Sequence, residues 1–166
     1  FWAGETGTRL MAEKLVERVV AERSFAAGLC RTKTLSIHGS EDWQPNGWHR
    51  LVENYPVSEE VARHLHQNYG CYAEQVAQIA AQGYAARLVE GLPLIEAEIV
   101  YACRSELAER AADVLARRLP LALLDTALAR QASSKVLQFM CIEKQWSEER
   151  LASEQMLLSE RLSVAL

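Results

Sequence analysis

The stretch Asp125-Thr-Ala-Leu-Ala-Arg-Gln-Ala-Ser-Ser-Lys-Val-Leu-Gln-Phe-Met-Cys-Ile-Glu-Lys144 decides the fold. Its apolar residues return at the three- and four-residue spacing of a helix, not at the two-residue spacing of a strand. Asp125 can accept hydrogen bonds from the first free backbone amides. We therefore predict a helix from Asp125 to about Lys144, whose buried side carries Leu128, Val136, Leu137, Phe139 and Met140.

The same spacing predicts helices along most of the remaining chain. They cover residues 10–23, 58–68, 71–82, 95–103 and 107–117, and a last helix opens at Ser147 and runs to Leu158 or beyond. The stretches 95–103 and 107–117 are either continuous or bent near Ser105. Only 8 Gly and 4 Pro interrupt the chain. We expect an all-α fold, a single compact bundle of about six or seven helices.

Residues 28–56 break the helical pattern and predict a long irregular connection. The alternation at Leu35 and Ile37 is compatible with a short strand. Trp43 and Trp48 have large rings that normally bury most of their area. Because a loop of this length is uncommon in a compact domain, we expect these rings to pack on this domain or on a surface outside the chain.

Composition excludes several classes of protein. At 166 residues, 49% apolar and 24% charged, the chain suits one compact domain and is not disordered. Its net charge of -4 provides no basic stripe for a phosphate backbone, so we expect no nucleic-acid partner. No apolar run reaches the roughly 20 residues that span a bilayer, and no signal peptide opens the chain, so we expect this piece to be soluble.

The cysteines and histidines do not have the spacing of a metal site. Cys30, Cys71, Cys103 and Cys141 lie far apart, without a Cys-x-x-Cys pair. We expect four reduced, buried thiols and no metal. His64 and His66 should point to different sides of a helix, so spacing gives them no ligand or acid–base role.

Three charged or glycine-rich motifs have structural explanations. Gly4-Glu5-Thr6-Gly7-Thr8-Arg9 precedes a helix and could hold an oxyanion, but a plain turn with an N-cap at Thr8 is the favoured explanation. Glu96 and Glu98 should cap their helix and pair with an arginine such as Arg104 or Arg117. Arg117-Arg118 should neutralise a helix end, or alternatively link to a carboxylate such as Glu96.

Three further segments resemble one protein family in order and spacing. They are His64-Leu-His-Gln-Asn-Tyr-Gly70 with Ala73-Glu-Gln-Val76, Ile95-Glu-Ala-Glu-Ile-Val-Tyr-Ala102, and Asp113-Val-Leu-Ala-Arg-Arg118 with Leu121-Ala-Leu-Leu-Asp125. The family shows "HL...YG..A..V", "EAE..YA" and "DVL.RRTRLAFLD". The chain from Met11 onward thus resembles the carboxy-terminal region of FAD-dependent glycerol-3-phosphate dehydrogenases, the quinone-linked respiratory enzymes of bacterial and mitochondrial membranes.

The resemblance implies a domain organisation and a division of labour. Residues 1–27 would be the last helix of the flavin domain with its N-terminal turn, residues 28–56 the connection, and residues 57–166 a non-catalytic C-terminal helical cap. The parent enzyme would carry FAD, whereas this chain lacks the Gly-x-Gly-x-x-Gly turn and is not expected to bind it. In the family, a Gly-Lys-Trp-Thr-Thr-Tyr-Arg segment lies close to the flavin and the substrate. Thr6 and Arg9 of this chain correspond to residues of that segment, so the resemblance implies that they bind the cofactor in the parent only.

The resemblance also implies what the parent does and where. It would oxidise sn-glycerol 3-phosphate to dihydroxyacetone phosphate, pass electrons to quinone, and lie peripherally at the bacterial or mitochondrial inner membrane. The partner of this chain would be the parent's FAD-binding domain. The resemblance also allows a homodimer. The sequence has no Asp-x-Asp-x-Asp-Gly run, so we expect no calcium site. The alternatives are the cap of a soluble glycerol-3-phosphate oxidase, or an autonomous helical interaction module.

Overall fold

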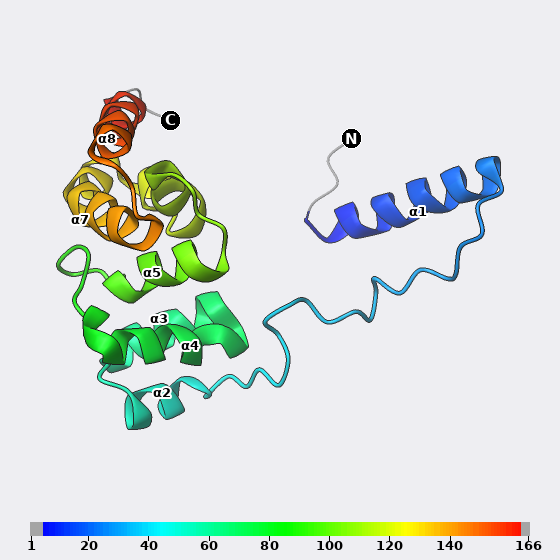
Figure 1. The fold of residues 1–166 in the computed structure, drawn as a ribbon. Helices are drawn as coiled ribbons and strands as arrows, with labels where there is room; N and C mark the ends of the chain where they lie inside the picture. The colour runs from blue at the N-terminus through cyan, green and yellow to red at the C-terminus, as the bar shows by residue number, and fades with distance from the viewer. Residues whose placement is uncertain (1–4, 164–166) are drawn as a thin grey trace. The chain divides into compact units, whose positions relative to one another are not determined.

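The computed structural model describes residues 5–163, and of Glu5 and Thr6 only the backbone. The described residues are mostly helical and contain no strand, which confirms the all-α prediction (Figure 1). The elements are α1 (Glu5–Arg23), α2 (Trp48–Asn54), α3 (Glu59–Tyr69), η1 (Gly70–Tyr72), α4 (Ala73–Ile79), η2 (Ala80–Tyr84), α5 (Glu96–Ser105), η3 (Asp113–Arg118), α6 (Leu121–Leu124), α7 (Thr126–Lys144) and α8 (Glu148–Ser163). The chain forms two compact units, the first ending at His38 and the second beginning at Gly39.

The first unit consists of α1 and the extended chain that follows it. The helix begins at Glu5, so the sequence prediction of a turn over residues 4–9 was wrong for residues 5–9. An ion pair between Arg9 and Glu13, one turn apart at 2.6 Å, supports these early turns. Nine of the large apolar side chains that the structure describes in this unit are exposed, namely Leu10, Met11, Leu15, Val16, Val19, Phe25, Leu29, Leu35 and Ile37.

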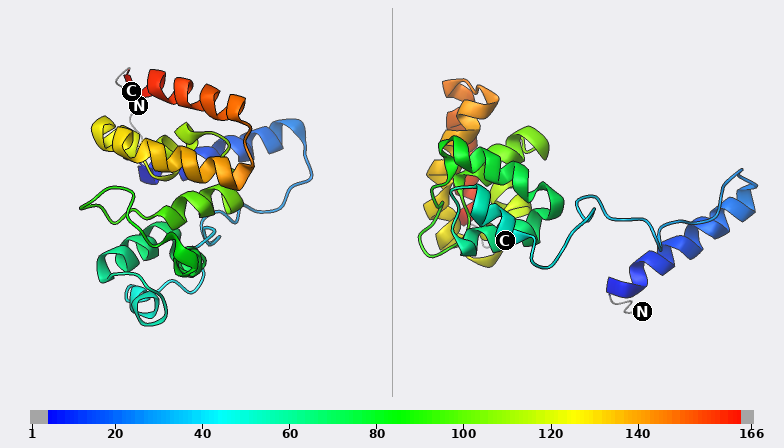
Figure 2. Two further views of the ribbon diagram at one scale, coloured as in Figure 1. Left: turned by 60° about the vertical axis from the view of Figure 1, so that its left-hand side comes forward. Right: turned by 90° about the horizontal axis from the view of Figure 1, so that it is seen from below.

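The second unit is built around α5. Seven of the ten residues of this helix are buried, including Ile99 and Val100. A helix that is apolar on every side must be covered on every side. Accordingly, α5 lies between α4 and α7 (Figure 1; Figure 2).

Two hydrophobic clusters flank α5. The first joins α5 to η3, α6, α7 and α8 through residues such as Leu115, Val136, Met140 and Leu158. The second joins α5 to α2, α3 and α4 through residues such as Trp48, Leu51, Leu65 and Val76. The central helix therefore connects two halves of one unit.

The helix α7 confirms the prediction made from Asp125 and its neighbours. It ends at Lys144, and Oδ1 of Asp125 accepts hydrogen bonds from the amides of Ala127 at 2.8 Å and Leu128 at 3.1 Å. Val136, Leu137 and Met140 are buried against the first cluster. Local capping and helical spacing are sufficient to define this helix.

The connection over residues 28–56 is less irregular than predicted. Residues 48–54 form α2, which the buried side chains of Trp48 and Leu51 attach to the second cluster. Leu35 and Ile37 form no strand, and both are exposed. A strand needs a partner for its backbone groups, and no ladder forms among the described residues.

The two stretches around Ser105 form separate helices. After α5 the chain turns at Leu107, whose φ is 55°, and helix resumes at Ala111. The carbonyl of Ala102 accepts from the amides of both Glu106 and Ala108, at 3.3 and 3.0 Å, so this corner is tightly closed. The predicted alternative of a continuous helix is therefore wrong.

Candidate functional site

A buried carboxylate, that of Glu98, joins α3 to α5. Its Oε1 accepts hydrogen bonds from Nε2 of His64 at 2.8 Å and from the hydroxyl of Tyr69 at 3.0 Å. Its Oε2 accepts from the backbone amide of Ile95 at 2.8 Å. The side chain of Glu98 is 1% exposed. These hydrogen bonds supply the partners that a buried carboxylate requires.

The geometry of this Glu98 cluster follows from local structure. Glu98 is the third residue of α5, and its carboxylate accepts from the amide of the N-cap residue Ile95, which is one half of a capping box. His64 and Tyr69 lie on α3, which presents them to α5. Burial, followed by the negative charge of Glu98, raises the pKa of Tyr69 well above its usual value. The phenol is therefore a stable hydrogen-bond donor.

The predicted arginine partners of the two glutamates were wrong. Glu98 binds the histidine and the tyrosine described above, and Glu96 pairs with Lys135 of α7 at 2.9 Å. The predicted capping role is confirmed for Glu98. The roles of His64 and Tyr69 were missed because these residues lie far from Glu98 in sequence, and only the motif around Tyr69 marked the region.

An open recess of about 480 Å³ lies beside the Glu98 cluster. Its lining comes from the end of α3, the corner after α5, and η3, and consists of Asn68, Tyr69, Ser105, Glu106, Leu107, Arg117 and Arg118. We call it the Leu107 recess. Asn68, Tyr69, Arg117 and Arg118 belong to the first and third of the segments that carry the family resemblance.

The two arginines of the Leu107 recess pair locally. Arg117 pairs with Asp113, one turn earlier. Nη2 of Arg118 donates to the carbonyl oxygen of Glu106 at 2.7 Å. The predicted alternative link from this pair of arginines to Glu96 is therefore wrong. Burial raises the pKa of Glu106, and the positive charge of Arg118 opposes that shift.

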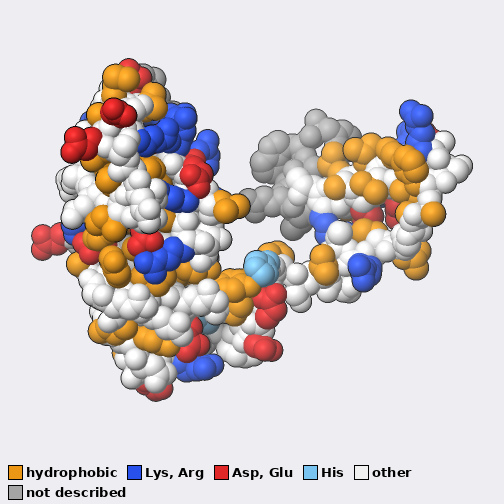
Figure 3. Space-filling model, viewed as in Figure 1, with side chains coloured by type: hydrophobic (Ala, Val, Ile, Leu, Met, Phe, Trp, Pro, Cys, Tyr) orange, Lys and Arg blue, Asp and Glu red, His pale blue; other side chains and the backbone are white. Residues whose placement is uncertain are grey.

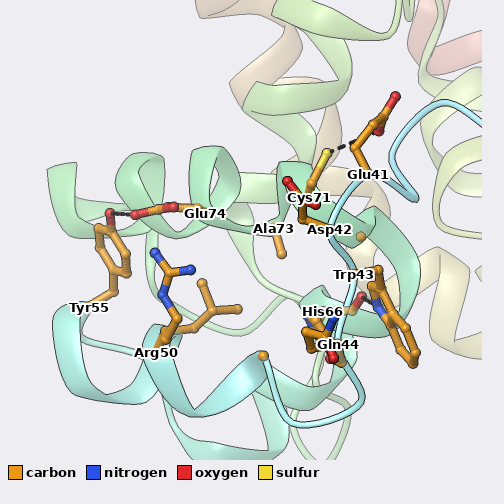
Figure 4. Close-up of a pocket in the computed structure, with 13 residues that line it drawn as sticks. Glu41, Asp42, Trp43, Gln44, Arg50, Tyr55, His66, Cys71, Ala73 and Glu74 are labelled. Atoms are coloured by element: carbon orange, nitrogen blue, oxygen red, sulfur yellow. Dashed lines mark hydrogen bonds between the residues drawn. The ribbon is translucent and has the colours of Figure 1, made fainter.

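A second hollow, of about 360 Å³, lies between α2, α4 and residues 41–47 (Figure 4). Trp43 stacks on His66 with ring centroids 5.1 Å apart, and Nε2 of His66 donates to the carbonyl oxygen of Gln44 at 2.6 Å. These contacts attach the loop to α3. The guanidinium of Arg50 points into the hollow, whose far rim carries Asp42 (Figure 4).

The thiol in this second hollow is not activated. Cys71 lies 3.5 Å from the carboxylate of Glu41. Desolvation, followed by this hydrogen bond, raises the pKa of Cys71. Reactive cysteines have a lowered pKa, because the thiolate is the nucleophile. The hollow therefore resembles a packing feature more than a nucleophilic site.

The sequence-predicted residues Thr6 and Arg9 both lie on α1. The structure describes only the backbone of Thr6. Arg9 donates to Glu13 at 2.6 Å and to the hydroxyl of Thr32 at 3.0 Å, beside an apolar groove of about 310 Å³ within the first unit. Figure 3 shows hydrophobic side chains gathered along this helix.

Residues 5–163 contain neither a metal-ligand cluster nor a membrane-spanning helix. Over this range, no group of three or more His, Cys, Asp or Glu side chains could hold a metal ion. In the same residues, no helix is both long enough and apolar enough to cross a membrane. The four cysteines are free thiols, and Cys103 is buried as expected. The expected burial is wrong for Cys30 and Cys71, which are exposed.

Comparisons with known proteins give a consistent result. The family model of the C-terminal domain of alpha-glycerophosphate oxidase matches residues 30–151. The mitochondrial glycerol-3-phosphate dehydrogenase of Mesocricetus auratus is 37% identical over 155 residues, covering 90% of this chain and 21% of that protein. The mitochondrial glycerol-3-phosphate dehydrogenase of Arabidopsis thaliana is 32% identical over 165 residues, covering 90% and 26%. The chain thus spans about a fifth to a quarter of these relatives. No solved structure matches it.

Proposed function

Because the chain belongs to the family of C-terminal domains of alpha-glycerophosphate oxidase, we propose that it is the non-catalytic helical cap of an FAD-dependent glycerol-3-phosphate dehydrogenase. The observation that carries this proposal is the match to the mitochondrial dehydrogenases over 90% of the chain. The parent enzyme would oxidise sn-glycerol 3-phosphate to dihydroxyacetone phosphate and pass the electrons to quinone. The cap would cover and brace the part that carries out this reaction.

The residues of this chain do not fit FAD. A dinucleotide site needs a strand that leads into a glycine-rich turn at the start of a helix. The described residues form no strand, and the sequence has no Gly-x-Gly-x-x-Gly run. We therefore assign the cofactor, and the chemistry that depends on it, to another part of the parent.

We assign α1 to the domain that precedes the cap. The family match begins at residue 30, after α1 has ended. This helix exposes apolar side chains such as Met11, Leu15 and Val16. An exposed apolar surface of this kind is typical of a face that packs against another domain. This arrangement supports the division into a flavin-domain helix over residues 1–27, a connection over 28–56 and a cap over 57–166. Thr6 and Arg9 would then face the flavin only in the parent.

Two alternative functions are supported by different observations. The name of the matching family favours a glycerol-3-phosphate oxidase, which uses oxygen as acceptor. An autonomous interaction module is less well supported, because the relatives match 90% of the chain. The dehydrogenase is favoured because the relatives named above are dehydrogenases.

The acceptor assay separates these functions. The full gene product is purified and supplied with sn-glycerol 3-phosphate, either with a soluble quinone or with oxygen alone. We expect oxidation with the quinone and little with oxygen. Activity with oxygen only would assign the cap to an oxidase, and absence of both activities would favour the module. Co-sedimentation with inner-membrane vesicles would test the proposed peripheral location of the parent, and gel filtration would test its dimerisation.

A further inference from the structure

We propose that the second hollow, between α2, α4 and residues 41–47, binds a small zwitterion that carries an oxyanion at one end and a primary ammonium group at the other. Its volume of about 360 Å³ falls within the usual range of small-ligand sites. Its thiol is not activated, so we assign binding to it and no chemistry. The proposal concerns the side chains of the hollow alone and does not depend on the oxidation of sn-glycerol 3-phosphate.

Two charged side chains of the hollow are unpaired among the described residues. Within residues 5–163, neither the guanidinium of Arg50 nor the carboxylate of Asp42 makes a hydrogen bond or an ion pair. The guanidinium of Arg50 points into the hollow from α2, and Asp42 lies on the opposite rim (Figure 4). The two side chains therefore do not neutralise each other. Each is open to a ligand group of the opposite charge.

The other two carboxylates of the hollow are engaged within the fold. Glu41 accepts from a backbone amide at 2.8 Å, and Glu74 accepts from the hydroxyl of Tyr55 at 3.0 Å. Their charges remain, so the lining carries three carboxylates and one guanidinium. The carboxylates would repel a simple anion, and a simple cation would leave Arg50 without a partner. A ligand that carries both charges satisfies Arg50 and Asp42 together.

The backbone on either side of Asp42 is held in place. Before it, the carbonyl oxygen of Gly39 accepts from the amide of Cys71 at 2.9 Å. After it, the carbonyl oxygen of Gln44 accepts from Nε2 of His66 at 2.6 Å. A backbone that is fixed before the ligand arrives loses less entropy on binding. The hollow is therefore preformed, as small-molecule sites usually are.

The groups of the ligand follow from these side chains. A guanidinium binds two oxygens of a phosphate or a carboxylate through parallel N–H bonds. A carboxylate accepts hydrogen bonds from a primary ammonium group. Leu51 and Ala73 are apolar members of the lining and can pack against a short methylene chain. A phosphoethanolamine unit has these three parts, either as a free solute or as a lipid headgroup.

Nuclear magnetic resonance of the isotope-labelled 166-residue chain tests this proposal, with O-phosphoethanolamine as the probe. We expect saturable shifts of the amides of residues 41–50 in the millimolar range. Inorganic phosphate alone and ethanolamine alone should bind at least about tenfold more weakly, because each lacks one of the two charge-assisted contacts. Equal binding of either component alone would overturn the zwitterion assignment. Absence of saturable shifts at these residues would overturn the site.

Two variants test whether the proposed side chains bind the probe. Arg50→Gln and Asp42→Asn should each weaken the binding of O-phosphoethanolamine at least about tenfold. Both should keep the melting temperature, because neither side chain has a partner to lose among residues 5–163. The controls Arg161→Gln and Glu53→Gln change exposed residues outside the lining and should bind as the unmodified chain does. Unchanged binding in either Arg50→Gln or Asp42→Asn would contradict the proposal.

Vesicles distinguish the two sources of the ligand. The chain is sedimented with phosphatidylcholine vesicles that either contain or lack phosphatidylethanolamine. Co-sedimentation that requires phosphatidylethanolamine and is lost in Arg50→Gln would support the site and identify its ligand as a lipid headgroup. Binding of O-phosphoethanolamine without co-sedimentation would support the site and identify its ligand as a free solute. Co-sedimentation that is unchanged in Arg50→Gln would reject the headgroup as the ligand of this hollow.

Discussion

The hydroxyl of Tyr69 donates a hydrogen bond to the buried carboxylate of Glu98 at 3.0 Å, and this contact ties α3 to the central helix α5. His64 binds the same carboxylate oxygen from one turn earlier on α3. A buried charge held in this way is costly to disturb. The Glu98 cluster is therefore a structural link, and the Leu107 recess lies directly beside it.

Replacing Glu98 by glutamine should destabilise the chain by about 2 to 3 kcal/mol. The amide keeps the shape but removes the charge, and its NH₂ group cannot accept from the donors that face it. Urea unfolding measures the change, with Glu53→Gln as the control, because Glu53 is exposed on α2. A loss no larger than that of the control would contradict the assigned role of the Glu98 cluster.

Gly70→Ala should destabilise the second unit by more than about 2 kcal/mol. A Cβ at Gly70 would lie 1.9 Å from the carbonyl oxygen of Gly39, and the φ of Gly70 is +56°. The same carbonyl accepts from the amide of Cys71 at 2.9 Å, and this bond would be broken. Thermal unfolding is the measurement. Gly28→Ala, with no atom within 4 Å of its new Cβ, should change the melting temperature little.

Cys103 should react with an alkylating reagent more slowly than the exposed thiols. Burial raises its pKa to about 11 from the model-compound value of 9.0. At pH 8 this lowers the thiolate fraction on the order of 100-fold relative to an ordinary thiol. Mass spectrometry after iodoacetamide treatment should find Cys30 modified well before Cys103. Equal rates in the folded chain would show that the thiol is accessible.

The raised pKa of Cys103 predicts that the folded state becomes less stable at high pH. Below about pH 9 the thiol is protonated in both the folded and the unfolded state, so its contribution is unchanged. As the pH rises from 9 toward 11, the unfolded state ionises first and folding becomes less favourable. Urea unfolding of Cys103→Ala should show a shallower decline over this range. Parallel declines would assign the effect to other groups.

Deletion of residues 1–38 should leave the second unit folded. Its core lies within residues 39–166, and the contact pattern divides the chain at Gly39. We expect the melting temperature to change by no more than about 3 °C and solubility to improve, because the exposed apolar side chains of α1 are removed. A melting temperature lower by about 10 °C or more would show that the first unit supports the second.

The sequence predicts helices whose signals are local. Asp125 and the spacing up to Met140 define α7, and Ser58 with the following glutamates defines the start of α3. Such caps and periodicities need no knowledge of distant residues. The helix α2 was missed because it begins directly after Gly47 and is held by burial of Trp48 in the second cluster.

The candidate site was harder to predict. The sequence assigns Glu98 a capping role but cannot identify His64, which is 34 residues away and meets it only after the helices pack. Arg117 pairs locally with Asp113, four residues earlier, whereas the sequence alone allowed the more distant Glu96 as a partner. For Thr6 and Arg9, the family resemblance provides the prediction, and their contact with flavin remains to be measured.

The most direct test compares the 166-residue chain with the full gene product for flavin and for activity. Each is purified, its absorbance is recorded near 450 nm after incubation with FAD and removal of the excess, and each is supplied with sn-glycerol 3-phosphate and a quinone. We predict bound flavin and substrate oxidation in the full product and neither in the chain. Oxidation of sn-glycerol 3-phosphate by the chain alone would contradict its assignment as a non-catalytic cap.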